Sequence, residues 1–304
     1  MDVYETGPRG LWLPLVTPFR GGALDEASLR RLVRHYAARS IDGLILAATT
    51  GEGLTLSDAE TETLVAVTTE ELAATGRRLP VFLGLSGSDT RKLLETLDRT
   101  AAWPIDGYLI ACPYYTRPSQ EGLFQHFAAL ADRAAWPILI YNIPYRTGVN
   151  LGNEAMLRLA EHANIIGVKD CCSDAAQSFD LMRARPHGFS VLTGEDALFF
   201  SALTQGADGG ITASAHLETA AFADVRTLLL TGDRPGALAR WRGLVDLTRL
   251  MFAEPSPAPV KYALFRLGLI DSAELRLPMT PVSDGLAYRI DRWIEDAGAL
   301  LKRA

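Results

Sequence analysis

The stretch Ile165-Ile166-Gly167-Val168-Lys169-Asp170 is a short apolar run that ends in a lysine, and it bears on both fold and chemistry. Polar residues stand on either side of the run, as is typical of a buried β-strand. A lysine at the end of such a strand is unusual, because removing an ammonium group from water is costly. Two interpretations are open. The Lys169 head extends past the strand end into solvent, or the amine loses its proton easily and acts as a nucleophile toward ketones.

Seven further runs of the same kind occur along the chain, and each is followed by a segment with helical periodicity. They are Leu11–Thr17, Gly43–Ala47, Pro80–Leu85, Gly107–Ala111, Pro137–Tyr141, Phe189–Thr193 and Gly209–Ala213. Apolar residues on both faces are typical of parallel strands that helices cover on both sides. Eight strand–helix units predict an α/β fold, the (β/α)8 TIM barrel. The alternative, a doubly wound open sheet, normally has a glycine-rich turn after its first strand, and Val16-Thr17-Pro18-Phe19 is not such a turn.

After about Gly232 the sequence predicts helices and no further strand. Arg234–Phe252, Pro259–Leu267 and Gly285–Leu301 each have apolar residues at helical spacing. We therefore expect two domains, a barrel with the active site over residues 1–232 and a C-terminal helical extension over residues 233–304.

Composition excludes several classes of function. The 304 residues carry a net charge of −6 and no basic stripe, which argues against nucleic acid as a partner. Neither a signal peptide nor a long apolar segment is recognisable, so we expect a cytoplasmic protein without a membrane partner. The cysteines Cys112, Cys171 and Cys172 are too few for a disulfide framework and lack metal-ligand spacing. Cys171 and Cys172 are interpreted as reduced bystanders.

In a barrel of this kind the carboxyl ends of the strands form one face, where active sites are built. The residues that follow the predicted strands are therefore expected on one rim: Thr49, Thr50, Tyr114, Tyr115, Tyr141, Arg146, Lys169, Gly194, Ile211 and Thr212. No histidine or carboxylate cluster with metal spacing accompanies them, so a metal hydrolase is disfavoured. The set suits imine chemistry, in which an amine attacks a ketone and a phenol in a hydroxyl relay moves the protons.

Three motifs on this rim resemble those of the dihydrodipicolinate synthase / N-acetylneuraminate lyase family of pyruvate-dependent class I aldolases. They are Thr49-Thr50-Gly51-Glu52, Tyr141-Asn142-Ile143-Pro144 and Gly167-Val168-Lys169. The resemblance covers nearly the whole chain. Further segments are similar to the synthase branch: 113–122, Arg146-Thr147-Gly148, Pro257-Ala258-Pro259-Val260-Lys261 and 275–281.

The resemblance implies that Lys169 forms a Schiff base with pyruvate and that no separate cofactor or metal takes part. Tyr141 would be the acid/base, linked through Thr49 to Tyr115. In this family that tyrosine reaches in from a neighbouring subunit, so a homo-oligomer, either a dimer or a tetramer, is implied.

The resemblance also implies a set of substrate-binding positions. Thr50, with backbone groups near Ile211 and with Gly194, would hold pyruvate. Arg146 would hold the carboxylate of an aldehyde. Each role has a simpler alternative: Tyr141 as a core residue, Thr49 and Thr50 as helix caps, Arg146 as a surface arginine. Glu52 is interpreted as a support for its loop.

The implied reaction condenses pyruvate with aspartate semialdehyde to 4-hydroxy-tetrahydrodipicolinate, on the path to lysine and diaminopimelate. Two alternatives stay open: a class I aldolase that cleaves a 2-keto-3-deoxy sugar acid or another 2-oxo acid, and a non-catalytic barrel that binds a 2-oxo acid. Arg146 suits an aldehyde with a carboxylate better than a polyol. Ala48 and Asp170-Cys171-Cys172 depart from the pattern of the synthase branch beside the pocket, which leaves the aldehyde open.

Overall fold

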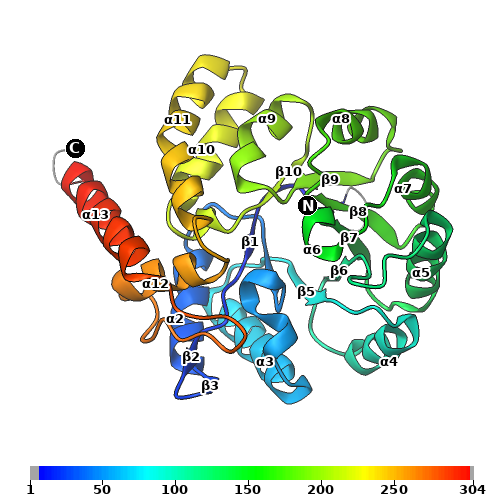
Figure 1. The fold of residues 1–304 in the computed structure, drawn as a ribbon, viewed down its shortest axis with the longest axis horizontal. Helices are drawn as coiled ribbons and strands as arrows, with labels where there is room; N and C mark the ends of the chain where they lie inside the picture. Colours follow the sequence, from blue (N-terminus) through cyan, green and yellow to red (C-terminus); the bar gives the residue numbers. More distant parts are fainter. Residues whose placement is uncertain (1–6, 302–304) are drawn as a thin grey trace.

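Eight parallel strands close into a barrel, which confirms the predicted (β/α)8 fold (Figure 1). The computed structural model describes residues 7–301. Around the barrel the strands follow one another in sequence order, and the first pairs with the last. They are β1 (Gly10–Pro14), β4 (Gly43–Leu46), β5 (Val81–Leu85), β6 (Gly107–Ala111), β7 (Ile138–Asn142), β8 (Ile165–Asp170), β9 (Ser190–Thr193) and β10 (Gly209–Ile211).

Helices surround the strands and connect each one to the next (Figure 1). They are α2 (Glu26–Ala37), α3 (Asp58–Thr75), α4 (Thr90–Thr100), α5 (Gln120–Arg133), α7 (Asn153–Leu159), α8 (Ala175–Ala184), α9 (Phe199–Thr204) and α10 (Thr219–Leu230). A four-residue helix, α6 (Pro144–Thr147), follows β7 directly. A small hairpin of β2 (Phe19–Arg20) and β3 (Ala23–Leu24) was not predicted, because strands of two residues are too short to show a period.

Capping contacts fix the start of α3. The Ser57 hydroxyl accepts a hydrogen bond from the backbone N–H of Glu60 at 3.2 Å, and the Glu60 carboxylate accepts one from the backbone N–H of Ser57 at 2.9 Å. This reciprocal pair satisfies two N–H groups that have no partner inside the helix. It sets where the chain turns from the loop after β4 into the helix.

Two apolar layers pack against the strands. The inner one fills the barrel with side chains that include Trp12, Phe82, Leu139 and Leu192. Trp12 meets Phe82 edge to face with ring centroids 4.9 Å apart, and its ring needs Gly43 beside it, since a Cβ there would lie 2.4 Å from the ring. The interior is thus a packed core rather than a channel. A ligand site is therefore confined to a barrel end.

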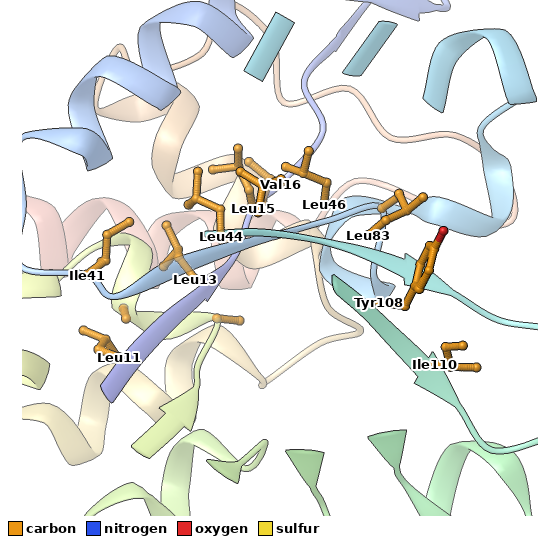
Figure 2. Packing of buried hydrophobic residues seen from close by; sticks show 14 of the residues in the cluster. Leu11, Leu13, Leu15, Val16, Ile41, Leu44, Leu46, Leu83, Tyr108 and Ile110 are labelled. Carbon is orange, nitrogen blue, oxygen red and sulfur yellow. The ribbon is translucent and has the colours of Figure 1, made fainter. Parts of the chain in front are cut away.

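The outer layer lies between the strands and the helices. Figure 2 shows part of it, where Leu13, Leu44 and Leu83 come from the adjacent strands β1, β4 and β5. Successive residues of a strand point to opposite faces, so Leu11 and Leu13 join this layer while Trp12 points inward. The same alternation explains why each predicted strand is apolar on both faces.

Beyond the barrel the structure has the three predicted helices, α11 (Arg234–Met251), α12 (Ala258–Arg266) and α13 (Asp284–Leu301). Figure 1 shows α13 projecting at the edge of the molecule, next to α12. Buried residues of α11 and α12, such as Trp241 and Leu264, belong to the same apolar layer as the barrel residues. The division at residues 232 and 233 stays a prediction. Within residues 7–301 no helix is both long and apolar enough to cross a membrane.

A buried ion pair joins this C-terminal part to the barrel. The Lys261 Nζ atom in α12 lies 2.7 Å from the Glu52 Oε1 atom in the loop after β4, and neither side chain is more than 1% exposed. The other carboxylate oxygen of Glu52 accepts a hydrogen bond from the backbone N–H of Arg276 at 3.0 Å. This confirms that Glu52 supports its loop. The main effect on Lys261 is burial, which lowers its pKa, while Glu52 acts in the opposite direction.

We predict that Lys261→Met destabilises the protein by about 3–5 kcal/mol, because it leaves the buried Glu52 charge without its partner. Denaturant unfolding of the variant and of an exposed-lysine control, Lys92→Met, measures the difference. Adding Glu52→Gln to Lys261→Met should recover part of the loss. A loss no larger than that of the control would contradict the role given to the ion pair.

Candidate active site

Lys169 lies at the carboxyl end of β8 with only 5% of its surface exposed. Its register partner on β7 is Tyr141, and the Lys169 Nζ atom lies 4.2 Å from the centroid of the Tyr141 ring. The interpretation that the lysine head extends into solvent is therefore wrong. Burial is the main reason that the pKa of Lys169 is lowered. A larger fraction of the amine is then neutral, which is the nucleophilic form.

Tyr141 is buried as well, but burial shifts its pKa in the opposite direction from that of Lys169. Burial raises the pKa of Tyr141 well above its usual value, with a hydrogen bond to the Thr49 side chain acting in the opposite direction. The phenol therefore keeps its proton near neutral pH. The structure brings together Lys169, Tyr141 and Thr49, which come from three different strand ends. A neutral amine beside a neutral phenol and a hydroxyl is suited to imine formation with proton transfer.

Gly194 allows the end of β9 to come against the lysine. A Cβ atom at this position would lie 2.5 Å from the Lys169 Cε atom and 2.4 Å from the Cys171 Sγ atom. Cys171 therefore packs with Lys169 against Gly194, and burial raises the pKa of its thiol well above the usual value. Cys171 and Cys172 are both free and buried, as expected for reduced cysteines. Any side chain in place of Gly194 would push into the lysine.

Two acidic residues next to Gly194 were not singled out from the sequence. Asp196 is buried, and its carboxylate accepts hydrogen bonds from the backbone N–H groups of Ala213 at 3.1 Å and Ser214 at 2.5 Å. It thereby fixes the turn after β10 against the end of β9. Burial is the main reason that the pKa of Asp196 is raised to about 6. Glu195 also faces the lysine, since its charge acts on the pKa of Lys169. Their position directly after a strand end is the signal that could have identified both.

Thr50 and Ile211 lie at the rim end of the barrel interior. Thr50 is 6% exposed in the turn after β4, and the carbonyl of its neighbour Gly51 accepts a hydrogen bond from the Thr17 hydroxyl at 2.6 Å. Ile211 is the last residue of β10 and belongs to the inner apolar layer. The part of these two residues in holding a carboxylate stays a prediction.

Arg146 lies in α6, beyond the end of β7, and its side chain is exposed. Its guanidinium carbon lies 5.7 Å from the centroid of the Tyr145 ring. Its positive charge lowers the pKa of both Lys169 and Tyr141, although burial has the larger effect on each. Arg146 also lines a cavity of about 360 Å³ that reaches Thr49. Lys169 and Tyr141 are not among the described residues that line this cavity, so the part of Arg146 in holding a substrate carboxylate stays a prediction.

Tyr115 is the one predicted site residue that the chain does not bring to the others. Its side chain is 91% exposed, and its backbone has a φ of 69°, which is costly for a residue other than glycine. A hydrogen bond of 3.1 Å from its backbone N–H to the carbonyl of Thr147 holds this conformation. The loop is thus fixed while the phenol points outward. Among the described residues, no group of three or more His, Cys, Asp or Glu side chains could hold a metal ion.

Comparison with known proteins shows which family this chain resembles. The model of the dihydrodipicolinate synthetase family matches residues 7–297. The chain is 42% identical over 285 residues to 4-hydroxy-tetrahydrodipicolinate synthase 2 of Clostridium acetobutylicum, which covers 94% of this chain and 99% of that protein. Among solved structures it resembles the 4-hydroxy-tetrahydrodipicolinate synthase of Methylacidiphilum fumariolicum SolV, with a TM-score of 0.91, 34% identity and 97% of each chain covered. The dihydrodipicolinate synthase of Aquifex aeolicus gives a TM-score of 0.91 at 30% identity, over 95% of this chain and 98% of that one.

We predict that Tyr141→Phe keeps the fold and lowers turnover with pyruvate and an aldehyde by roughly 10²–10⁴, the usual contribution of a positioned acid or base. The substitution keeps the ring that packs beside Lys169 and removes only the hydroxyl. Steady-state kinetics measure the loss, and thermal unfolding checks the fold. Turnover close to that of the wild type would make Tyr141 a core residue without a catalytic role.

Proposed function

Because the chain belongs to the dihydrodipicolinate synthetase family, we propose that it is a 4-hydroxy-tetrahydrodipicolinate synthase, a lyase that condenses pyruvate with aspartate semialdehyde. The observation that carries the proposal is the buried Lys169 amine against the Tyr141 ring, at the end of the barrel where strands terminate. The product would serve the biosynthesis of lysine and diaminopimelate. A non-catalytic barrel has no need of this amine–phenol pair.

In the first step the neutral Lys169 amine attacks the keto carbon of pyruvate. A carbinolamine forms, and its hydroxyl leaves as water once it has received a proton from the Tyr141 phenol. The result is an iminium between Lys169 and the former keto carbon. Thr49 accepts or returns the proton of Tyr141 through their hydrogen bond. No separate cofactor is required, since the lysine itself provides the electron sink.

In the second step the iminium draws electrons from the neighbouring methyl carbon, which loses a proton and becomes the nucleophilic carbon of an enamine. This carbon attacks the aldehyde of aspartate semialdehyde and forms the new carbon–carbon bond. The aldehyde oxygen becomes a hydroxyl by taking a proton, and the iminium is restored. Tyr141 is the group beside Lys169 that is able to move these protons.

In the last step the ammonium group of the bound aldehyde part gives up a proton to solvent, and the resulting amine attacks the iminium carbon. A six-membered ring closes, a proton passes from the attacking nitrogen to the lysine nitrogen, and the Lys169 amine leaves. One water is lost overall, so the atoms of pyruvate and aspartate semialdehyde are conserved in 4-hydroxy-tetrahydrodipicolinate. Thr50, together with Gly194 and backbone groups near Ile211, would hold the pyruvate carboxylate during these steps, and Arg146 the carboxylate of the aldehyde.

The exposed Tyr115 supports an oligomer as the working form. Its phenol lies outside this chain's own pocket on a loop fixed by backbone contacts, where it is available to the pocket of a second copy. A dimer or tetramer would complete the relay from Tyr115 through Thr49 to Tyr141. Both substrates are small metabolites, and we place the enzyme in the cytoplasm without a nucleic-acid or membrane partner.

Lys169 should be trapped by borohydride when pyruvate is present, because reduction turns the iminium into a stable secondary amine. The chain has four lysines, Lys92, Lys169, Lys261 and Lys302, so peptide mass spectrometry locates the adduct without ambiguity. Lys169→Met should take no label. A label on another lysine, or none on the wild type, would overturn the Schiff-base assignment.

Arg146→Ala should lower the efficiency with aspartate semialdehyde roughly 10- to 100-fold, since a hydrogen bond to a charged group contributes about 1.5–3 kcal/mol and about 1.4 kcal/mol is tenfold. Borohydride trapping with pyruvate should stay almost unchanged, because Lys169 and Thr50 hold pyruvate and burial, not Arg146, is the main cause of the lowered pKa of Lys169. Steady-state kinetics compare the variant with Arg183→Ala, an exposed arginine on α8. A wild-type enzyme that ignores aspartate semialdehyde and cleaves a 2-keto-3-deoxy sugar acid would refute the synthase while keeping the class I lyase.

A further inference from the structure

We propose that Asp196 and His216 are positioning residues that hold the two turns expected to bind the pyruvate carboxylate, one after β10 and one after β4. This inference rests on the proposed function and deepens it, because it assigns what sets the shape of that binding site. Thr50 lies in the turn after β4, and Ile211 ends β10. β1 lies between these two strands in the barrel and carries none of the predicted site residues. The spacing of the two turns therefore depends on contacts around the end of β1.

Asp196 connects the end of β9 to the turn after β10. Its side chain is buried, and its two oxygens accept hydrogen bonds from the backbone N–H groups of Ala213 at 3.1 Å and Ser214 at 2.5 Å. The donors lie 17 and 18 positions further along the chain, so the contact is a tertiary one. Hydrogen bonds from N–H groups to a carboxylate are among the stronger ones, and two of them on one carboxylate fix the direction of the turn.

His216 connects the same turn to the end of β1. Its Nδ1 atom lies 2.8 Å from the carbonyl oxygen of Ala213, and its Nε2 atom lies 3.3 Å from the backbone nitrogen of Val16. A carbonyl oxygen only accepts and a backbone N–H only donates, so Nδ1 carries the proton and Nε2 accepts. Burial is the main reason that the pKa of His216 is lowered to about 4. The ring therefore stays neutral near neutral pH and keeps both bonds.

Thr17, the residue after Val16, continues the connection to the turn after β4. Its hydroxyl donates to the carbonyl oxygen of Gly51 at 2.6 Å, and Gly51 directly follows Thr50. The two segments are in close contact, because a Cβ atom on Gly51 would lie 2.9 Å from the carbonyl oxygen of Leu15. Thr17 is fully buried, so water does not compete for this bond.

These bonds form one buried path, which we call the rim path: Asp196, the Ala213–Ser214 turn, His216, Val16–Thr17 and Gly51. Its members follow β9, β10, β1 and β4, which are successive strands of the closed barrel. A site assembled from separate turns is precise only if its supporting groups have fixed positions. Breaking the rim path should therefore change the affinity for pyruvate more than the rate of the chemical steps, which are assigned to Lys169 and Tyr141.

The first test is His216→Asn, which cuts the rim path at β1. The shorter amide can still donate to the Ala213 carbonyl in place of Nδ1, but it does not reach the Val16 N–H group. KM for pyruvate should rise roughly 5- to 50-fold while kcat stays within about threefold of the wild type, because binding is lost and chemistry is kept. The pyruvate concentration that gives half-maximal borohydride trapping should rise by a similar factor. His216→Gln, whose amide oxygen reaches the position of Nε2, should recover part of the loss.

His126→Asn is the matched control. His126 is also buried, and its Nε2 atom has no hydrogen-bond partner among residues 7–301. Its Nδ1 atom lies 2.8 Å from the Thr90 hydroxyl, in a contact between α5 and α4 away from the rim path. Both asparagine variants lose the same ring, and only His216→Asn loses a bond of the rim path. Thermal unfolding checks that each variant is folded.

Thr17→Val is a second variant, which keeps the side-chain shape and removes the hydroxyl that donates to Gly51. It should show the same rise in KM for pyruvate with kcat kept, and it serves as the test if His216→Asn does not fold. Combined with His216→Asn, it should add less than the product of the two separate losses, because either change cuts the same path.

The assignment fails if His216→Asn and Thr17→Val bind pyruvate as tightly as His126→Asn. It also fails if kcat falls while KM for pyruvate stays the same, or if the two losses multiply as those of independent sites do. A wild type that borohydride does not label in the presence of pyruvate would refute the proposed function itself. A labelled wild type with variants like the control would refute only the positioning role.

Discussion

Closure of the parallel barrel is the constraint on which the rest of the structure depends. Because all eight strands run the same way around one axis, their carboxyl ends meet at one rim, and residues far apart in the sequence become neighbours there. The inner layer around Trp12 and Phe82 fills the barrel below that rim. The candidate active site therefore lies at the rim, with the apolar inner layer below it and charged side chains around it.

Burial at the apolar end of the barrel interior shifts the pKa values of the two central groups in opposite directions. Desolvation disfavours whichever form of a group is charged, so it lowers the pKa of Lys169 and raises that of Tyr141. Both groups are driven toward their neutral forms, which are the nucleophile and the proton donor that imine chemistry requires. Arg146 follows β7, and Glu195 and Asp196 follow β9, so charged side chains stand after both strands that flank β8. The barrel thus accounts both for the burial of Lys169 and Tyr141 and for the charged residues that follow the neighbouring strand ends.

The C-terminal part of the chain supports the loop that carries two of the candidate site residues. The loop after β4 carries Thr49 and Thr50, and Glu52 in that loop is held by Lys261 from α12 and by the backbone of Arg276. A buried ion pair is costly to assemble, and this one connects the loop after β4 to α12. The helical extension therefore supports the rim from outside the barrel.

The sequence alone predicted the eight strands and the helical segments that follow them, because these depend on local periodicity. It also indicated that the candidate lysine, tyrosine, threonine and arginine stand at or after strand ends, while their roles in the site stay predictions. It predicted Glu52 as a support but not its partner, since Lys261 lies 209 positions away and only folding brings the two together. It also missed Glu195 and Asp196, two adjacent acids that no local pattern distinguishes. Tertiary packing decided that the Asp196 carboxylate accepts hydrogen bonds from the backbone N–H groups of Ala213 and Ser214. Whether a buried polar group has a hydrogen-bond partner depends on all the segments that pack around it. Those segments can lie far apart in the sequence, so a local sequence pattern does not show them.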